Sequence, residues 1–428
     1  MMTQSELLLE EKFESYAGRT LYPHLNSSHR SFIKKLALTY RFTFQELRQI
    51  SEISRDFEMW RGSAFETHWN QLEKETPAEL QGSRRKDYLF KELIRKVNEL
   101  KHKPAVYSNN SVSSPKRNPL RIVTEKTDKK IFGDCPVASP KTVCCNLKTI
   151  DAVENCAFGC SYCTIQTFYG SRIAFDSQFK EKLERIELDP NRFYHIGTGQ
   201  SSDSLVWGNR EGILDHLCDF ARKYPNVLLE FKTKSDNVAY FTKEGLPRNI
   251  VLSWSLNTQT IVQNEEHFTA SLEKRLSAAR RVADRGVKVA FHFHPIVYYE
   301  GWEKDYAALA ERVKKMFSEE EVLFISFGSV TFIKPVIQKI RKRGEPTKIL
   351  QMEMVPDPHG KLTYPDSVKL KLFGMMYNAF KSWHEKVFMY LCMERAYFWD
   401  EVFGWHYPTN EEFELDFGLK TMQKVNAA

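Results

Sequence analysis

The chain has 428 residues, of which 42% are hydrophobic and 27% are charged. This length and composition exclude a small disulfide-stapled module and a chain that is disordered throughout. The 62 Lys and Arg outnumber the 55 Asp and Glu, so the net charge of +7 suits an anionic partner without requiring one. The first sixteen residues lack the basic and apolar segments of a secretory signal, and no uncharged apolar run is long enough to span a bilayer. We therefore expect a cytoplasmic protein.

Residues 1–101 form a predicted helical N-terminal region. Thr43 and Glu46 fit a capping box, and apolar residues recur at helical spacing after it, as they do over 32–40 and 86–101. The two helices joined near Arg41 have the arrangement of either a DNA-binding helix-turn-helix or a packed αα-hairpin. We expect the hairpin, which is the commoner outcome.

The pattern changes after this region. Residues 102–119 are rich in Pro, Ser and Asn and predict a linker or loop. Strand-like and helix-like runs then alternate through 120–405, which we expect to form one barrel domain, followed by a C-terminal tail over 406–428. Such repeats predict an α/β fold with a parallel sheet, closed fully or partly into a barrel with its chemistry at the C-terminal strand ends. The predicted strands are 149–153, 193–197, 227–233, 250–256, 287–293 and 322–327.

Six of the eight cysteines fall between Cys135 and Cys163. The last three, Cys156, Cys160 and Cys163, have the spacing Cys-x3-Cys-x2-Cys and follow the first strand of the series. Three thiolates on one loop can bind three irons of a [4Fe-4S] cluster and leave the fourth iron open. That iron can accept the amino and carboxylate groups of S-adenosylmethionine (SAM). The alternatives are a zinc site completed by a distant ligand, or cysteines that are merely buried.

This loop resembles the signature of the radical SAM superfamily. By that resemblance Cys156, Cys160 and Cys163 are the cluster ligands, and Tyr162 lies against the SAM adenine. The resemblance implies cofactors, a [4Fe-4S] cluster and SAM, that together yield a 5'-deoxyadenosyl radical.

Further segments, in the expected order over roughly 130–405, resemble the spore photoproduct lyase family. The resemblance implies a partial (β/α)6 TIM-type radical SAM barrel and a reaction that returns a methylene-bridged thymine dimer in DNA to two thymines. By position, Ser202, Lys234 and Ser255 match the family's SAM-contacting residues, although a strand-end turn role is as good an explanation for the two serines alone. The matching segments are Cys163–Thr167, Gly199–Asp203, Thr233–Ser235, Ser255–Thr258, Pro295 with Glu300–Trp302, and Tyr390–Glu394.

Two positions depart from that family. Gln200 stands where the family has a hydrogen-donating cysteine, and Thr164 stands where it has a tyrosine after the third cluster cysteine. An amide cannot donate a hydrogen atom to a carbon radical as a thiol can. Either the substrate differs, or another thiol has taken over. The candidate thiols are Cys144, Cys145, Cys218 and Cys392, and we assign no role to Cys135, Cys144 or Cys145 as a metal site.

Two basic stretches, Lys116–Lys130 and Lys334–Lys348, are typical of phosphate contacts, although such runs are usually solvated helix faces. With the resemblance added, DNA is the partner expected at Lys334–Lys348, and a flavodoxin or ferredoxin is the expected electron donor. No membrane partner is expected. Tyr298, Tyr299 and Trp302 can stack on an extruded base, but we expect them to pack as a lid.

The leading hypothesis is a radical SAM enzyme that acts on a pyrimidine photolesion or another nucleic-acid site in DNA, with C–C bond cleavage as a possible lyase reaction. An alternative keeps the radical chemistry but directs it to a metabolite or a protein, which would explain Gln200 and Thr164. A second alternative is a non-enzymatic nucleic-acid-binding protein whose cysteine loop holds a structural metal.

Overall fold

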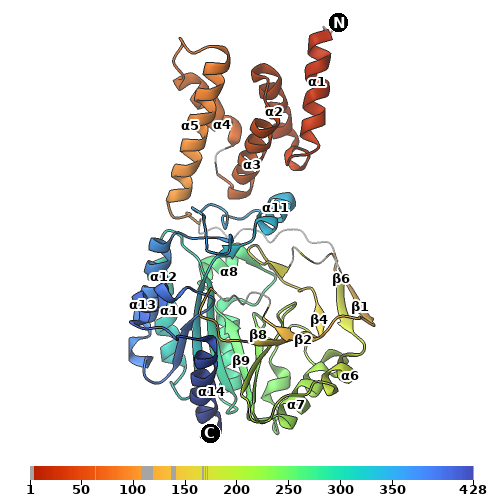
Figure 1. Cartoon of the computed structure of the whole chain (residues 1–428), viewed down its shortest axis with the longest axis vertical. Helices are drawn as coiled ribbons and strands as arrows, with labels where there is room; N and C mark the ends of the chain where they lie inside the picture. The colour runs from red at the N-terminus through yellow and green to blue at the C-terminus, as the bar shows by residue number, and fades with distance from the viewer. Residues whose placement is uncertain are drawn as a thin grey trace. The chain divides into compact units, whose positions relative to one another are not determined.

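The computed structural model describes residues 4–62, 64–107, 119–135, 141–165, 168, 170 and 172–427, except for the side chains of residues 5 and 6. The chain divides into two compact units (Figure 1). The first comprises residues 1–107 and 332–354, and the second comprises 108–331 and 355–428. Residues 332–354, expected within the barrel domain, therefore cluster with the N-terminal helices. Most of the predicted linker, 108–118, lies outside the described residues.

The first unit is helical, as the periodicity predicts. Thr43 accepts a hydrogen bond from the Glu46 backbone, and the Glu46 carboxylate accepts one from the Thr43 backbone at 2.6 Å, which confirms the capping box. The core contains the fully buried Phe65 and Trp69. Its helices are α1 (Gln4–Ala17), α2 (Ser27–Tyr40), α3 (Phe44–Trp60), α4 (Phe65–Glu75), α5 (Gly82–His102) and α11 (Lys334–Arg343).

Helix α11 joins this unit through charge as well as apolar packing. Arg341 donates two hydrogen bonds of 2.8 Å to Asp56 on α3, and a third of 3.0 Å to Glu52. Burial alone would lower the pKa of Arg341, but the Asp56 and Glu52 carboxylates outweigh it and raise the pKa. The pairing of a distant insert with α3 explains why sequence order alone misplaces residues 332–354.

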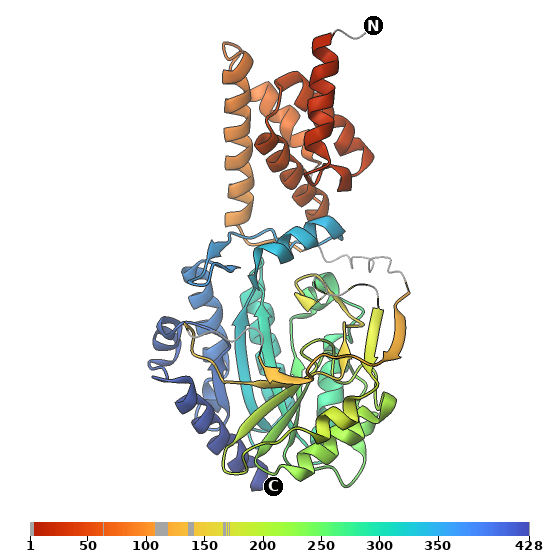
Figure 2. The ribbon, with the colours of Figure 1, turned by 45° about the vertical axis from the view of Figure 1, so that its right-hand side comes forward.

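The second unit is built on a curled sheet of eight strands (Figure 2). Seven strands are parallel, and β2 pairs antiparallel to β3 at one edge. The predicted α/β fold with a partial barrel is confirmed. The strand order is β16 (Phe388–Leu391), β12 (Val322–Ser329), β11 (Lys288–Ile296), β9 (Ile250–Ser255), β8 (Val227–Thr233), β7 (Tyr194–Thr198), β3 (Lys148–Ile150) and β2 (Phe132–Asp134).

Helices cover the convex side of this sheet, where α7, α9 and α12 contact β8, β9 and β12. The buried residues of α9, among them Leu276 and Val282, lie at the helical spacing seen in the sequence. The helices of this unit are α6 (Phe179–Glu184), α7 (Ile213–Lys223), α8 (Gln259–Glu265), α9 (Leu272–Ala283), α10 (Trp302–Met316), α12 (Asp366–Ala379), α13 (Ala396–Phe403) and α14 (Asn410–Asn426). None of the described helices is both long enough and apolar enough to cross a membrane.

Residues 406–428, expected as a tail, contain the helix α14. The Phe417 ring lies 4.6 Å from His195 on β7 and 5.2 Å from Phe324 on β12, so α14 packs against strands from both halves of the sheet. Phe413 and Phe417 are fully buried. The terminal helix therefore completes the barrel core.

Short strands flank the sheet. Strand β6 pairs parallel with β1 and antiparallel with β4, β10 pairs antiparallel with β5, and β14 with β15. These strands are β1 (Arg121–Glu125), β4 (Val153–Glu154), β5 (Gly159–Cys160), β6 (Arg172–Asp176), β10 (Glu266–His267), β13 (Thr331–Phe332), β14 (Val355–Pro356) and β15 (Leu362–Thr363).

Candidate functional site

The three-cysteine loop lies between β4 and β6, just after the C-terminal end of the first parallel strand. Asn155 closes the base of the loop, because its amide donates hydrogen bonds to the Gly170 and Arg172 carbonyls at 2.7 and 3.0 Å. Its side-chain oxygen accepts from the Cys156 backbone at 2.8 Å. Asn155 has a left-handed φ of 70°, a conformation that Asn tolerates better than most residues. The loop is thus anchored at its first cysteine.

A second anchor holds the middle of the loop. Strand β10 pairs with β5 so that Glu266 lies opposite Cys160. The Ser161 backbone donates to the Glu265 carbonyl at 2.8 Å, and the Ser161 hydroxyl donates to the Glu265 carboxylate. A Cβ on Gly159 would lie 3.0 Å from the Phe268 ring, so the two strands approach closely there. The cysteines are therefore presented by a supported loop.

Glu266 is the centre of a buried charge network behind the loop. It receives a hydrogen bond from the Tyr162 hydroxyl and forms an ion pair of 2.5 Å with Arg275, which is completely buried. Burial alone would raise the pKa of Glu266, but the Arg275 guanidinium and the Lys234 ammonium outweigh it and hold the pKa below its ordinary value. The carboxylate is ionised at neutral pH and fixes the ring of Tyr162.

Lys234 lies at the C-terminal end of β8, beside this network. Its ammonium is 5.8 Å from the centre of the Tyr162 ring. Burial would lower its pKa, but the Glu266 carboxylate and the Cys160 thiol outweigh that and raise it, so the side chain is cationic. Among the described residues the ammonium has no hydrogen-bond or ion-pair partner within range. A half-buried cation with no carboxylate of the described residues within ion-pair distance suits the carboxylate of a ligand.

Asp203 fixes the strand ends around Lys234. Its carboxylate accepts from the backbones of Leu205, Val206 and Lys234 at 3.0, 2.9 and 2.7 Å, and from the Thr233 hydroxyl at 2.9 Å. These bonds tie the loop after β7 to the end of β8. Burial nevertheless raises the pKa of Asp203 above its ordinary value.

The two predicted serines also lie at strand ends. Ser202 is buried, and its hydroxyl has no partner among the described residues. Ser255 ends β9 and is half-buried, while its carbonyl accepts from Arg275 at 2.9 Å. The positions of these serines and Lys234 on adjoining strand ends suit SAM contacts, and the assignments of Ser202, Lys234, Ser255 and Tyr162 stay predictions.

The two residues that depart from the family resemblance also lie near the C-terminal strand ends, which form the rim of the barrel. Gln200 and Thr164 are half-buried, in the loop after β7 and directly after Cys163. Gly199, just before Gln200, has a φ of 75°, and a Cβ there would lie 2.5 Å from the Ser204 hydroxyl. The backbone turn that carries position 200 therefore requires glycine.

The cysteines themselves suit a metal cluster. Cys156 and Cys160 are buried, and Cys163 is half-buried. Burial raises the pKa of Cys156 to about 12 and also raises that of Cys160, so these thiols ionise only with a cationic partner. The unpartnered Ser202 hydroxyl and the unpaired Lys234 suit a polar, anionic ligand beside such a cluster. No three His, Cys, Asp or Glu of the described residues are placed to hold a single metal ion.

The other candidates are dispersed. Cys218 lies on α7, beside Tyr240 and away from the loop. Tyr299 and Trp302 are buried, and the Tyr299 hydroxyl donates to Asp305 at 2.6 Å and bonds to the Thr258 hydroxyl at 2.8 Å, so these two rings pack as expected. Tyr298 is half-buried.

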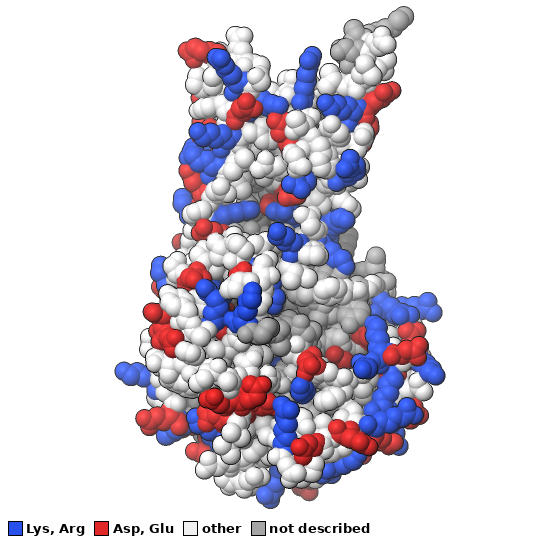
Figure 3. All heavy atoms as spheres, viewed as in Figure 1, with Lys and Arg blue, Asp and Glu red and all other residues white. Residues whose placement is uncertain are grey.

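In the basic stretch Lys334–Lys348, Arg341 is paired within the first unit, while Lys334 and Lys342 are exposed. Figure 3 shows acidic and basic side chains interspersed over much of the viewed face. Residues 116 and 117 of the other basic stretch lie outside the described residues.

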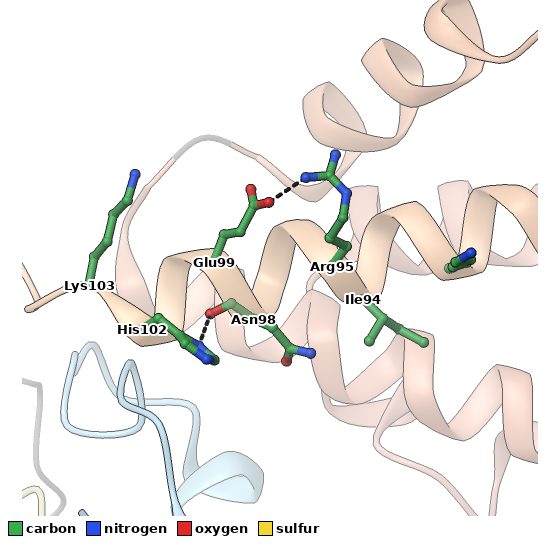
Figure 4. A pocket seen from close by; sticks show the side chains of 7 residues that line it. Ile94, Arg95, Asn98, Glu99, His102 and Lys103 are labelled. Carbon is green, nitrogen blue, oxygen red and sulfur yellow. Dashed lines mark hydrogen bonds and ion pairs between the residues drawn. The ribbon is translucent and has the colours of Figure 1, made fainter. Parts of the chain in front are cut away.

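A groove of about 660 Å³ runs along α5 in the first unit (Figure 4). Arg95 bonds to Glu92 at 2.8 Å and also to Glu99, and the His102 ring bonds to the Asn98 carbonyl at 2.8 Å. Its charged groups are therefore largely engaged with one another. The groove contains none of the predicted site residues.

Sequence reasoning missed the residues that hold the loop. Glu265, Glu266, Arg275, Asp203 and Asn155 carry no spacing motif, because each acts through a contact with a distant segment. The one available signal was the pair of adjacent glutamates directly before a predicted helix.

A curled parallel sheet with a Cys-x3-Cys-x2-Cys loop beyond its first strand, and a lysine at a neighbouring strand end, defines a protein of the radical SAM class. The family model described as spore photoproduct lyase matches residues 148–361, half of the chain. The chain belongs to this family.

Individual relatives are more distant. The spore photoproduct lyase of Clostridium acetobutylicum is 26% identical over 196 residues, which are 44% of this chain and 58% of that protein. The Bacillus subtilis enzyme is 27% identical over 209 residues, covering 47% and 61%. The matched segment thus spans about three fifths of the curated relatives.

Solved structures agree on the fold. A spore photoproduct lyase double mutant with bound AdoMet and dinucleoside spore photoproduct matches 66% of this chain and 88% of its own, with a TM-score of 0.54 and 20% identity. A single mutant covers 70% and 94%, with a TM-score of 0.55 and 20% identity. The barrel fold is therefore shared with this family.

Proposed function

We propose that the protein is a radical SAM enzyme that acts on a pyrimidine photolesion in DNA. The observation that carries the proposal is the half-buried Lys234 ammonium, which has no ion-pair partner among the described residues and lies beside a supported three-cysteine loop. A cation held in this position without a direct ion-pair partner provides a binding group for the SAM carboxylate.

Each residue has a definite role in this proposal. Cys156, Cys160 and Cys163 hold a [4Fe-4S] cluster, which when bound supplies the electron that cleaves SAM to methionine and a 5'-deoxyadenosyl radical. Lys234 binds the SAM carboxylate, and the hydroxyls of Ser202 and Ser255 bind polar atoms of the same molecule. Tyr162, fixed by Glu266, packs against the adenine.

The substrate class follows from the family. Its members are named spore photoproduct lyases, and a neighbouring structure holds a dinucleoside spore photoproduct. The exposed Lys334 and Lys342 are suited to contact the DNA backbone, and a flavodoxin or ferredoxin is the proposed electron donor. The cytoplasm, where thiols stay reduced, is the proposed compartment.

A second candidate is a radical SAM enzyme with a substrate other than DNA. The observation that favours it is the presence of Gln200 and Thr164 at the two positions where the family resemblance leads us to expect a thiol and a phenol. Such a substrate would need neither residue.

Anaerobic turnover separates these candidates. The protein is reconstituted with iron and sulfide, reduced with dithionite and mixed with SAM, with and without dinucleoside spore photoproduct or ultraviolet-irradiated thymine-rich DNA. We expect 5'-deoxyadenosine to increase with the lesion and thymine to be restored. SAM cleavage that is indifferent to the lesion would favour the second candidate. No cleavage by a protein with a full cluster and bound SAM would overturn both, and a colourless zinc protein would support a structural metal instead.

A further inference from the structure

The inner face of the curled sheet is identified by side chains that meet across it. Glu230 on β8 bonds to His292 on β11 at 2.5 Å, although β9 lies between these strands. Glu230 also bonds to His195 on β7 at 2.9 Å, and His292 bonds to Ser326 on β12 at 2.5 Å. Because side chains alternate along a strand, every second residue from these positions also faces inward.

Two residues further toward the C-terminal strand ends, the same strands contribute a second level of inward positions. This level lies one inward position before Lys234 on β8. It contains Lys232, His294, Gly197 and Gly328, and the two glycines contribute no side chains. A Cβ on Gly328 would lie 2.7 Å from the His294 ring, so the imidazole occupies the space that the glycine leaves. The Lys232 side chain is 26% exposed and His294 is half-buried, so this level is accessible to a ligand.

An unused polar group lies on the neighbouring strand β9. Ser253 on β9 is the register partner of Lys232 and is fully buried. Its hydroxyl has no partner among the described residues. Burial, with the His292 and Lys232 charges, lowers the pKa of His294 to about 3, so that imidazole is neutral. The level thus offers a cation and a neutral ring below Lys234, and the adjoining strand β9 adds a buried hydroxyl without a partner among the described residues.

Cys392 belongs to this level. Tyr390 pairs in register with Ser326, and the Cys392 backbone donates to the Phe327 carbonyl at 2.8 Å, so Cys392 continues the inward face of β16 next to Gly328. The side chain is half-buried. Burial raises the pKa of Cys392, so the thiol keeps its proton.

Two of the neighbouring thiols, Cys144 and Cys145, are less exposed than Cys392, while Cys135 is half-buried like it. The Val143–Glu394 bridge brings Cys144 and Cys145 beside Cys392, but both are buried. A hydrogen bond from Cys145 lowers the pKa of Cys144, which favours the thiolate form of Cys144. Cys135 follows the edge strand β2, where its backbone donates to Leu147 at 3.0 Å.

A carbon radical made at the rim has to be quenched inside the barrel. Among protein side chains a thiol is the best hydrogen-atom donor, because its S–H bond is weaker than the C–H bond that forms. We propose that Cys392, at the end of β16, is the hydrogen-atom donor to the substrate radical in place of a residue at position 200. This assignment rests on the proposed function.

The step balances as follows. The Cys392 S–H bond breaks homolytically, a C–H bond forms on the substrate, and Cys392 is left as a thiyl radical. One electron from the external one-electron reductant and one proton from solvent restore the thiol. Each turnover therefore consumes two electrons and one SAM, and yields one 5'-deoxyadenosine.

The test is turnover of dinucleoside spore photoproduct in D2O by the reconstituted full-length protein. Thiol hydrogens exchange with solvent, so we expect one deuterium in the thymine product of the wild type. In Cys392→Ala and Cys392→Ser we expect thymine to fall about a hundredfold while 5'-deoxyadenosine stays within about twofold of wild type. Cys218→Ala, outside the barrel, is the matched control and should retain both products.

Thiol labelling gives a readout that does not depend on turnover. Cys392 is modified with methyl methanethiosulfonate and quantified by mass spectrometry, with and without the dinucleoside, and we expect the dinucleoside to slow its modification but not that of Cys218. Equal labelling in both conditions, wild-type thymine yield from Cys392→Ala, or loss of thymine in Cys135→Ala alone would overturn the assignment while the proposed function stands. No thymine from the wild type would overturn the proposed function and, with it, this assignment.

Discussion

The rim of the barrel and the level below it are built on different principles. At the rim, charged and polar groups are bonded to one another, as in the Asp203 and Glu266 networks, whereas the Ser202 hydroxyl has no hydrogen-bond partner and the Lys234 ammonium no ion-pair partner among the described residues. Below the rim, two glycines contribute no side chains, the His294 ring packs against Gly328, and Lys232, His294 and Cys392 are half-buried. The rim is formed by the segments that resemble the family, while the level below contains Cys392, the proposed hydrogen-atom donor.

The largest effect should come from the cluster ligands. Cys156→Ala removes one thiolate and should reduce both bound iron and 5'-deoxyadenosine formation to below about one hundredth of wild type. Iron and sulfide analysis with product quantification measures this. Cys218→Ala is the control, and a Cys156→Ala protein with full iron and full SAM cleavage would contradict the assigned ligand set.

Substitutions of Lys234 and Lys232 test whether the rim binds SAM independently of the level below it. Lys234→Met removes the cation at the rim and should weaken SAM binding by about 10- to 100-fold, the loss of a charge-assisted bond. Lys232→Met, one step deeper, should leave SAM affinity within about threefold. Titration calorimetry on the reconstituted protein measures both. Equal losses in the two variants would remove the distinction between the levels.

Position 200 tests whether the loop after β7 and the end of β16 reach the same substrate. The double variant Gln200→Cys, Cys392→Ala moves the thiol from the end of β16 to the loop after β7. It should form thymine about tenfold faster than Cys392→Ala, the effect of roughly 1.4 kcal/mol on the barrier. Product analysis measures the rescue. A rate no higher than that of Cys392→Ala would show that position 200 does not reach the substrate.

The Glu266→Gln substitution tests how much the buried Glu266–Arg275 pair at the rim stabilises the protein. Glu266→Gln leaves Arg275 buried without its anion and should lower the free energy of unfolding by about 3 kcal/mol at neutral pH. Because the folded pKa of Glu266 is depressed, its contribution is complete above the unfolded value of about 4.3 and is lost as pH falls through the folded pKa. Denaturant unfolding between pH 7 and pH 3 should show the two proteins converging on acidification. A constant difference would contradict this role.

The smallest effect concerns the exposed lysines of α11. Lys334→Gln with Lys342→Gln should weaken DNA binding by about threefold and reduce the salt slope by about two. Turnover of the short dinucleoside should not change. Fluorescence anisotropy over a salt series measures the slope, and an unaltered slope would exclude these lysines from the DNA contact.

The sequence predicted most of the site residues at the rim but few of the residues that hold them in place. Strand periodicity located the six central strands, and cysteine spacing located the loop. Strand β16 was missed because Phe388–Leu391 is only four residues long. Glu266, Arg275 and Asp203 were missed because their roles arise from contacts between segments far apart in the chain. Cys392 was named only as one of four thiols, since its inward direction depends on register with β12.

The most direct test of the central claim is the electron paramagnetic resonance spectrum of the reconstituted, dithionite-reduced protein, recorded with and without SAM. If Cys156, Cys160 and Cys163 leave one iron open beside Lys234, the reduced protein should give a [4Fe-4S] signal that shifts when SAM is added. Lys234→Met should need about 10- to 100-fold more SAM for the same shift. A full-strength cluster signal that saturating SAM leaves unchanged would contradict the account.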